Sequence, residues 1–229
     1  MEAAPVKPAA SVLVALATMG LCVPIARAEA IGQAEKEGWS PEGYLLSLGV
    51  GAYHPSGNED FDRFWAGDNG PLILVEFDFF LYRIPFLGPI GIGIGGGWAG
   101  YKGPVPDTTQ TTKFSIFPLN TMAVLRIDAL ARETPVPLVF TGKIGYTNVF
   151  YNEDDGSGKQ GGRSGGLGWA AQLALELNFI NQRRANALDE DWGINSSFFF
   201  FELAGADANR PDARVGDKLY FTGGVGLTF

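Results

Sequence analysis

The last eight residues of the chain, Thr222 to Phe229, restrict the fold more than any other segment. They alternate polar or glycine residues with apolar ones, and the last residue is aromatic. In a strand this pattern produces one apolar face and one small, polar face. We expect one face to hold Leu219, Phe221, Val225, Leu227 and Phe229, and the other to hold Tyr220, Thr222, Gly224, Gly226 and Thr228.

This ending is similar to the C-terminal β-signal by which the assembly machinery recognises bacterial outer-membrane β-barrels. The residues that fit the signal are Thr222, Gly224, Leu227 and Phe229. A soluble protein seldom ends on an amphipathic strand, because termini lack packing and fray. The pattern would also suit the last strand of a soluble β-sandwich, so the rest of the chain has to decide between the two.

The N-terminus has the layout of an export signal. Residues 9–25 are mainly apolar, Lys7 precedes them, and Ala26-Arg27-Ala28 forms an A-x-A cleavage site. These features predict a cleaved signal peptide over residues 1–28. The only cysteine, Cys22, lies within it, so the mature chain can form neither a disulfide nor a cysteine-based metal site.

The mature chain is acidic and fits one domain. Loss of Lys7, Arg27 and Glu2 with the signal peptide changes the formal net charge from −8 to −9. This balance argues against nucleic-acid binding. We expect a periplasmic segment over residues 29–42 and a barrel over residues 43–229. No later apolar run is long enough for a spanning helix, so a membrane protein of this kind must cross the bilayer as strands.

Two-residue alternation recurs in eight segments, each about long enough to cross a bilayer as a tilted strand. We expect strands over residues 44–53, 72–82, 90–99, 114–128, 138–151, 167–179, 196–206 and 219–229. In the third segment isoleucines alternate with glycines, so Ile92 and Gly93 point to opposite faces. Glycine suits a crowded lumen, where a small hydroxyl at Gly93 would still fit, whereas on a solvated face it would only weaken the strand.

The connections alternate in length. Those after the first, third, fifth and seventh strands are long and rich in Asp, Gly, Asn and Pro: residues 54–70, 102–113, 152–166 and 207–217. Residues 83–89 and 129–137 form shorter connections, and 181–194 breaks the pattern with an expected helical turn over 182–189. With both termini in the periplasm, the long loops are all extracellular. The sequence therefore predicts an all-β fold, an eight-stranded antiparallel up-and-down transmembrane β-barrel of the outer membrane.

Six charged residues on the polar faces are candidates for binding within the lumen: Glu76, Asp78, Arg126, Lys143, Glu176 and Glu202. Charges in a packed lumen must be paired, because an unpaired buried charge is costly. Lys143 and Glu176 lie nearly equally far from the centre of the 152–166 loop, which places them close to opposite each other in a symmetric hairpin. The charges indicate either a salt-bridged plug or a path for a small solute, for which the Gly91–Gly97 row would leave a groove.

An enzymatic site is a further hypothesis. His54 and Ser56 resemble the His and Ser of lipid A-trimming barrel esterases, with Glu59 or Asp60 as the acid that orients the imidazole. Pro55 ends the strand at this point, which favours an ordinary loop. The acidic loops lack the spacing of an EF-hand, and no phosphate-binding loop is present, so we predict neither a metal nor a cofactor.

Several short motifs occur between residues 40 and 229. They are Ser40-Pro41, Gly51-x-Tyr53-x-Pro55, Ile84-Pro85-Phe86, Phe117-Pro118-Leu119, Leu130-Ala131-x-x-x-Pro135-Val136-Pro137, Arg184-Ala185-x-x-Leu188-Asp189-x-Asp191-x-Gly193-Ile194-Asn195 and Phe200-Phe201-Glu202. In these motifs the chain resembles a family of small outer-membrane β-barrel proteins of myxobacteria, of the eight-stranded OmpA and OmpW type. The resemblance implies a fold and a location, and it implies no reaction or ligand.

We therefore expect a non-enzymatic outer-membrane barrel with a structural or surface-interaction role, acidic extracellular loops and a packed polar lumen. The alternatives are a narrow porin-like transporter or small-ligand-binding barrel and, third, an outer-leaflet lipid-modifying enzyme. Expected partners are outer-membrane lipids and lipopolysaccharide, with the barrel assembly machinery and periplasmic chaperones during biogenesis. We expect no nucleic-acid partner and a monomeric state.

Overall fold

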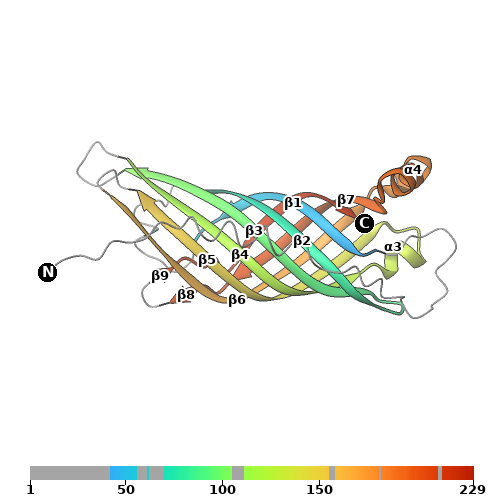
Figure 1. The fold of residues 1–229 in the computed structure, drawn as a ribbon, viewed down its shortest axis with the longest axis horizontal. Helices are drawn as coiled ribbons and strands as arrows, with labels where there is room; N and C mark the ends of the chain where they lie inside the picture. Colours follow the sequence, from blue (N-terminus) through green and yellow to red (C-terminus); the bar gives the residue numbers. More distant parts are fainter. Residues whose placement is uncertain are drawn as a thin grey trace. The chain divides into compact units, whose positions relative to one another are not determined.

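Eight antiparallel strands close into a barrel in the computed structural model of the protein (Figure 1). The structure describes residues 42–55, 61, 70–104, 111–154, 158–180, 182–210 and 213–229, so the expected signal peptide lies outside the described residues. Contacts divide the chain into residues 1–37 and 38–229, and all described residues belong to the second unit. The predicted all-β, eight-stranded barrel is confirmed.

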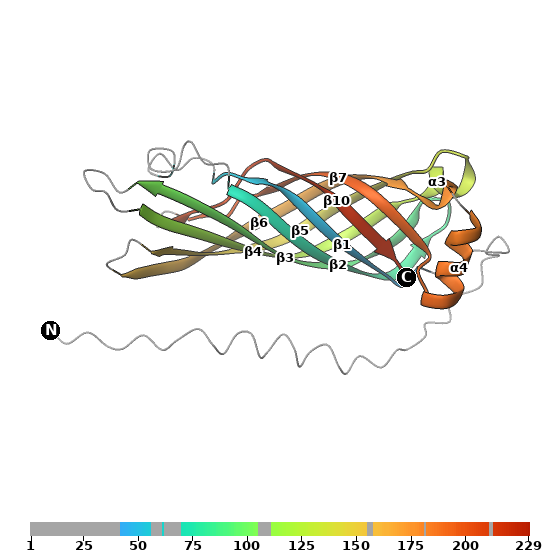
Figure 2. The ribbon, with the colours of Figure 1, turned by 90° about the horizontal axis from the view of Figure 1, so that it is seen from above.

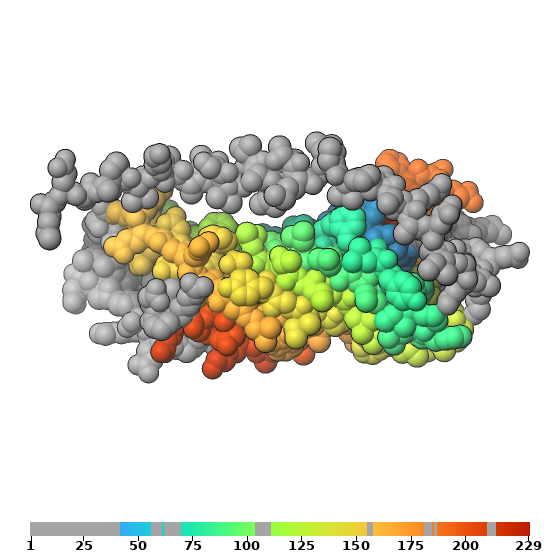
Figure 3. Space-filling model, turned by 60° about the horizontal axis from the view of Figure 1, so that its bottom comes forward, coloured from blue at the N-terminus to red at the C-terminus, as the bar shows by residue number. Residues whose placement is uncertain are grey.

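The barrel strands are β1 (Tyr44–Tyr53), β2 (Gly70–Ile84), β3 (Gly88–Pro104), β4 (Thr111–Ile127), β5 (Leu138–Asp154), β6 (Lys159–Glu176), β7 (Ser196–Ala206) and β10 (Tyr220–Thr228). Each strand pairs with its neighbour in the chain, and β1 pairs with β10 to close the wall. Outside the barrel, β8 (Asn209–Arg210) and β9 (Ala213–Arg214) form a small hairpin. Figure 3 shows the outer surface of β2 to β6 (cyan to orange) as a continuous wall, with side chains filling the surface between neighbouring strands.

The barrel has two unlike ends. At the terminal end, which holds Glu42 and Phe229, β2–β3 is a tight turn, and the other two connections carry helices α3 (Ala129–Glu133), η2 (Asn178–Ile180) and α4 (Gln182–Trp192). The helical turn expected over 182–189 is confirmed and extends to Trp192. The described residues of the remaining connections, including β8 and β9, lie at the opposite or distal end.

Large apolar side chains cover the outward face of the barrel strands, and the inward face holds the charged residues together with glycines, small polar residues and some apolar side chains. The outward row of β3, for example, exposes Ile92 and Ile94, whereas Gly91, Gly93 and Gly95 are buried inside. The outward side chain of Val50 on β1 is 61% exposed, and that of Ile144 on β5 is 58% exposed. The predicted division of the faces is therefore confirmed for most positions.

Tyr82 is an exception to the predicted faces. The register between β2 and β3 shifts between Phe80 and Tyr82, so Leu81 is an extra residue with no cross-strand partner on β3. Such a β-bulge moves every later side chain to the other face of the strand. Tyr82 therefore points outward and is 57% exposed, whereas strict two-residue alternation with Glu76 and Asp78 predicts it on the inward face, which is wrong.

Several strands run further than predicted at the distal end. The expected loops 102–113 and 152–166 shrink to residues 105–110 and 155–158, because β3, β4, β5 and β6 continue as paired strands. Their distal parts hold glycine and polar residues on both faces, and such residues give no alternating signal although they pair normally. At the terminal end β6 stops at Glu176, and the residues predicted to extend it to 179 enter η2.

The inward glycines make room for particular side chains. A β-carbon on Gly93 would overlap the carboxylate of Asp78 and crowd the side chain of Val124. A side chain at Gly93 would therefore need Asp78 or Val124 to shift, so the structure favours a destabilising effect of Gly93→Ser over the neutral one expected from the sequence.

The Gly93→Ser variant should lower the free energy of unfolding by about 1–3 kcal/mol, the usual cost of overpacking. Gly142→Ser on the outward face of β5 is the control for replacing a strand glycine, since a β-carbon there meets no atom within 4 Å. Urea titrations of both variants and the wild type measure the difference. Equal stability of the two variants would show that Asp78 does not occupy the space beside Gly93.

Candidate functional site: the charged interior of the barrel

All six charged residues proposed for the lumen point into the barrel and are buried: Glu76, Asp78, Arg126, Lys143, Glu176 and Glu202. They come from β2, β4, β5, β6 and β7, so the closed wall gathers them from around the circumference. Their placement agrees with the alternation of the strands, and a binding role for them remains a prediction.

Lys143 is the centre of the first charged cluster. Its Nζ lies 2.6 Å from Glu76 Oε2, 3.5 Å from Glu202 Oε2 and 3.6 Å from Asp78 Oδ2. These carboxylates belong to β2 and β7, which do not neighbour β5 in the wall. One ammonium group therefore links three strands through the interior, by charge-assisted contacts that are stronger than neutral hydrogen bonds.

The Lys143 cluster holds more negative than positive groups, because three carboxylates surround one ammonium. Gln172 Nε2 on β6 donates a hydrogen bond of 3.3 Å to Glu202 Oε2. The buried side-chain oxygens of Ser47, Thr141 and Thr222 have no hydrogen-bond partner among the described residues. Buried polar atoms of this kind are usually satisfied by internal water, so the cluster offers a polar, anionic environment.

A second cluster lies nearer the terminal end around Arg126. Its Nη2 donates a hydrogen bond of 2.9 Å to Glu176 Oε1, and its Nε lies 3.9 Å from Glu42 Oε2. The predicted pairing of Lys143 with Glu176 is wrong, because Lys143 lies opposite Ala170 in the β5–β6 register. The error follows from the loop: β5 and β6 turn at 155–158, which shifts the centre of the hairpin away from the middle of 152–166.

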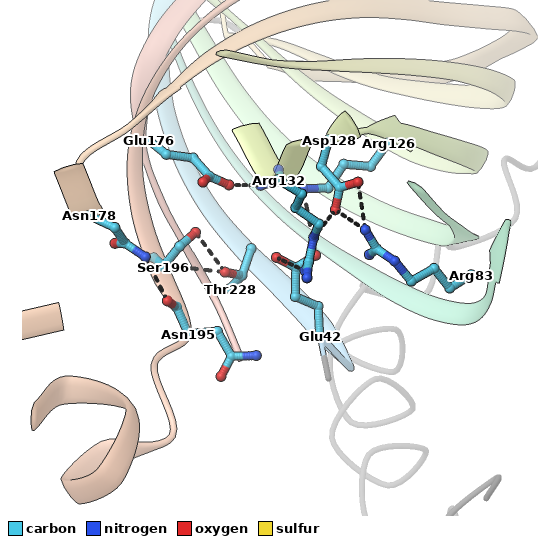
Figure 4. A network of polar contacts seen from close by, with 10 residues as sticks. All are labelled: Glu42, Arg83, Arg126, Asp128, Arg132, Glu176, Asn178, Asn195, Ser196 and Thr228. Atoms are coloured by element: carbon cyan, nitrogen blue, oxygen red, sulfur yellow. Dashed lines mark hydrogen bonds and ion pairs between the residues drawn. The ribbon is translucent and has the colours of Figure 1, made fainter. Parts of the chain in front are cut away.

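Asp128 connects the terminal end of the barrel to helix α3 (Figure 4). It accepts hydrogen bonds of 2.7 Å from Arg83 Nη2 and 2.8 Å from Arg132 Nε. Arg132 also lies 3.2 Å from Glu42 Oε1, so the residue just before β1 is tied into the same network. Sequence reasoning did not select Arg83, Arg132, Asp128 or Glu42. Only the four-residue spacing of Asp128 and Arg132 on a short helix could have indicated a pair.

An aromatic cluster fills the interior at the distal end. Phe61, Tyr101 and Phe114 are buried and meet edge to face, with ring centroids 5.0 Å apart for Phe61 and Tyr101. The Tyr53 hydroxyl donates a hydrogen bond of 2.8 Å to the carbonyl of Val215, and the Tyr101 hydroxyl donates one to the carbonyl of Tyr53. These contacts bind the distal connections to the barrel wall.

His54, the histidine of the esterase hypothesis, belongs to this distal packing. Its backbone N–H donates a hydrogen bond of 2.8 Å to Asp217 Oδ2, and its ring meets Phe61 edge to face at 5.3 Å. Burial raises the pKa of Asp217 above its ordinary value, although the N–H groups of His54 and Leu219 act in the opposite direction. The other members of the hypothesis, Ser56, Glu59 and Asp60, lie outside the described residues.

Side chains occupy the space beside the glycine row of β3, where a solute path would need a groove. The space beside Gly93 holds Asp78, that beside Gly95 holds Glu76, and that beside Gly97 holds Leu72 and Leu74. In the described part of the chain, no group of three or more His, Cys, Asp or Glu side chains is arranged to hold a metal ion. No helix among the described residues has the length and apolar character to span a bilayer.

Comparison with known proteins identifies the fold. No protein-family model matches the chain, and no curated protein does. Among solved structures, the chain is similar to the outer membrane protein OprG from Pseudomonas aeruginosa, with a TM-score of 0.53 and 12% identity over 84% of this chain and 98% of that one. The chain therefore has the fold of small outer-membrane β-barrels.

Two further similarities are weaker. Neisserial surface protein A (NspA) aligns with a TM-score of 0.47 and 13% identity, over 81% of this chain and 96% of that one. Ail, the attachment invasion locus protein of Yersinia pestis, aligns with a TM-score of 0.43 and 11% identity, over 82% of this chain and 100% of that one.

Replacement of Lys143 by methionine should destabilise the barrel by roughly 3–5 kcal/mol, because three buried carboxylates would lose the ammonium group that they share. Lys159, whose side chain is 72% exposed, provides the control, and Lys159→Met should change stability by less than about 0.5 kcal/mol. Urea unfolding of both variants measures the loss.

A second comparison separates charge from packing. In a background that also carries Glu76→Gln, Asp78→Asn and Glu202→Gln, Lys143→Met should lower the free energy of unfolding much less than it does in the wild type. An equal loss in the two backgrounds would show that the lysine acts by volume and not by charge.

Proposed function

We propose that the protein is an outer-membrane barrel with a structural or surface-interaction role, holding its distal loops outside the cell and both termini in the periplasm. The observation that carries the proposal is the inverted distribution of side chains: apolar residues cover the exterior and charged residues are buried inside. A soluble barrel would bury its apolar face and carry charges outside. In a bilayer, the apolar exterior is buried by lipid and the closed wall leaves no strand edge unpaired.

Aromatic side chains at both ends of the strands support a lipid-facing band around the barrel. Trp98 and Phe117 point outward towards the distal ends of β3 and β4, and Tyr44 and Phe79 do so towards the terminal ends of β1 and β2. Tryptophan and tyrosine gather at the two membrane–water interfaces, where one part of the ring system is apolar and the other is wet. The two groups would thus mark the edges of the lipid-facing band.

Lipopolysaccharide is the lipid partner that we propose at the distal end. Lys102 on β3 and Lys113 on β4 are directly opposite each other in the register, and both face outward beyond Trp98. Paired ammonium groups just above an aromatic girdle suit the phosphates of an outer-leaflet lipid. Membership in the myxobacterial family rests on the sequence motifs alone and belongs to the same proposal.

A narrow transporter is the second candidate, and the excess of carboxylates around Lys143 favours it for cations. The filled spaces beside the β3 glycines and the aromatic cluster at the distal end favour the structural role. Planar-bilayer recordings distinguish the two: the structural role expects no steady conductance, and a stable cation-selective current would establish the transporter. For the esterase hypothesis, hydrolysis of lipid A that is lost in His54→Ala would establish an enzyme.

The orientation can be tested with single cysteines, because the mature chain contains none. Gly158→Cys in the β5–β6 connection should react with a membrane-impermeant maleimide on intact cells. Phe86→Cys in the β2–β3 turn should react only after the outer membrane is permeabilised. Labelling of Phe86→Cys but not Gly158→Cys on intact cells would reverse the topology, and labelling of both in a soluble fraction would contradict the membrane location.

Phe229 should be required for insertion. Its ring stacks on Tyr44 with centroids 4.8 Å apart, and its carbonyl accepts hydrogen bonds from the backbone N–H groups of Gly43 and Tyr44. Deletion of Phe229 should leave the protein in the periplasm, where it is degraded. Phe229→Tyr keeps the backbone and the aromatic ring and should assemble. A heat-modifiable barrel in the outer-membrane fraction of the deletion, at wild-type abundance, would contradict an assembly signal.

A further inference from the structure

The connection between β6 and β7 exposes more apolar surface than its position requires. In η2, Phe179 is 57% exposed and Ile180 is 68% exposed, and Trp192 at the end of α4 is 74% exposed. These fractions match or exceed those of the lipid-facing rows, although the connection lies at the terminal end, beyond the strands. Large apolar groups gathered in this way usually mark an interaction surface.

Helix α4 has one apolar face. At 100° per residue, the spacing of Ala185, Leu188 and Trp192 places the three side chains on one side of the helix. Glu190 lies on the opposite side and is exposed. Figure 2 shows α4 running across the long axis of the barrel rather than along it. A helix in this orientation lies parallel to the plane of a membrane that surrounds the barrel.

The connection begins and ends at the lipid-facing band. Leu175 on β6 and Phe199 on β7 are cross-strand partners, and both point outward. The chain leaves the wall just after the first and returns just before the second. The connection that carries η2 and α4 therefore starts and ends at the terminal edge of the outward rows of β6 and β7.

Hydrogen bonds hold this connection against the wall. The N–H of Leu177 donates to the carbonyl of Ser197 over 2.8 Å, and Asn178 Nδ2 donates to the carbonyl of Asn195 over 2.9 Å. The N–H of Asn195 in turn donates to the carbonyl of Thr228 over 2.8 Å. Both ends of the connection are thus fixed to the barrel, which holds α4 close to the terminal ends of β6 and β7.

We propose that η2 and α4 form an interfacial anchor that lies on the periplasmic leaflet of the outer membrane. Its partner is the boundary between phospholipid headgroups and acyl chains, which takes the rings of Phe179 and Trp192 and the side chains of Ile180 and Leu188. Amphipathic helices bind lipid surfaces in this way, and tryptophan prefers that depth. The inference rests on the proposed outer-membrane location and adds a second contact with the membrane, outside the strands.

Single-cysteine variants of the mature chain test the anchor. Leu188→Cys and Trp192→Cys probe the apolar face, Glu190→Cys probes the opposite face, and Ile144→Cys probes the middle of the lipid-facing band. Each variant is labelled with an environment-sensitive fluorophore and reconstituted into phosphatidylethanolamine–phosphatidylglycerol vesicles that contain nitroxide lipids. The nitroxide is placed either near the headgroup or deep in the acyl chain.

The anchor predicts that labels at 188 and 192 lose most of their fluorescence to the shallow nitroxide and less to the deep one. The label at 144 should show the reverse, and the label at 190 should keep its fluorescence with both. If 144 is quenched while 188 and 192 behave like 190, the anchor is wrong and the barrel location stands. If 144 is not quenched either, the proposed membrane location fails as well.

Discussion

Closure of the wall between the first and last strands is the constraint on which the rest of the structure depends. Leu45 to Ala52 on β1 pair with Phe221 to Thr228 on β10, so the sheet has no open edge. The closed wall is narrow, and small residues at the seam make room inside it: a β-carbon on Gly226 would overlap the ring of Phe198. The charged clusters exist because closure brings distant strands within reach of one another.

Much of the fold could be predicted from the sequence, because lipid-facing and interior positions differ in chemistry at every second residue. The alternating signal is absent beyond the lipid-facing part of each strand, so the glycine-rich distal part of β6 has the sequence pattern of a loop. The bulge at Leu81 was also invisible, since an extra residue between Phe80 and Tyr82 changes the facing without changing the composition. Helix α3, with five residues, is too short to show a helical period.

The charged residues of the interior could be predicted individually, but their partners could not. Alternation along one strand shows that Lys143 and Glu76 point inward. Their contact depends on how β5 and β2 are staggered around the barrel, and no local pattern records that stagger. The predicted pairing of Lys143 with Glu176 depends on the boundaries of the β5–β6 loop, and it is wrong because the loop is shorter than predicted. Arg83 and Glu42 lie at strand ends, where the alternating pattern no longer assigns a face.

The fit between Gly93 and Asp78 bears on how such a barrel can change during evolution. The two residues face each other across β2 and β3, and the carboxylate of one occupies the volume that a side chain on the other would need. A larger residue at 93 therefore displaces the Asp78 carboxylate or favours a shorter residue at 78, and losing Asp78 removes a carboxylate from the Lys143 cluster. Residues 78 and 93 should therefore covary among related barrels.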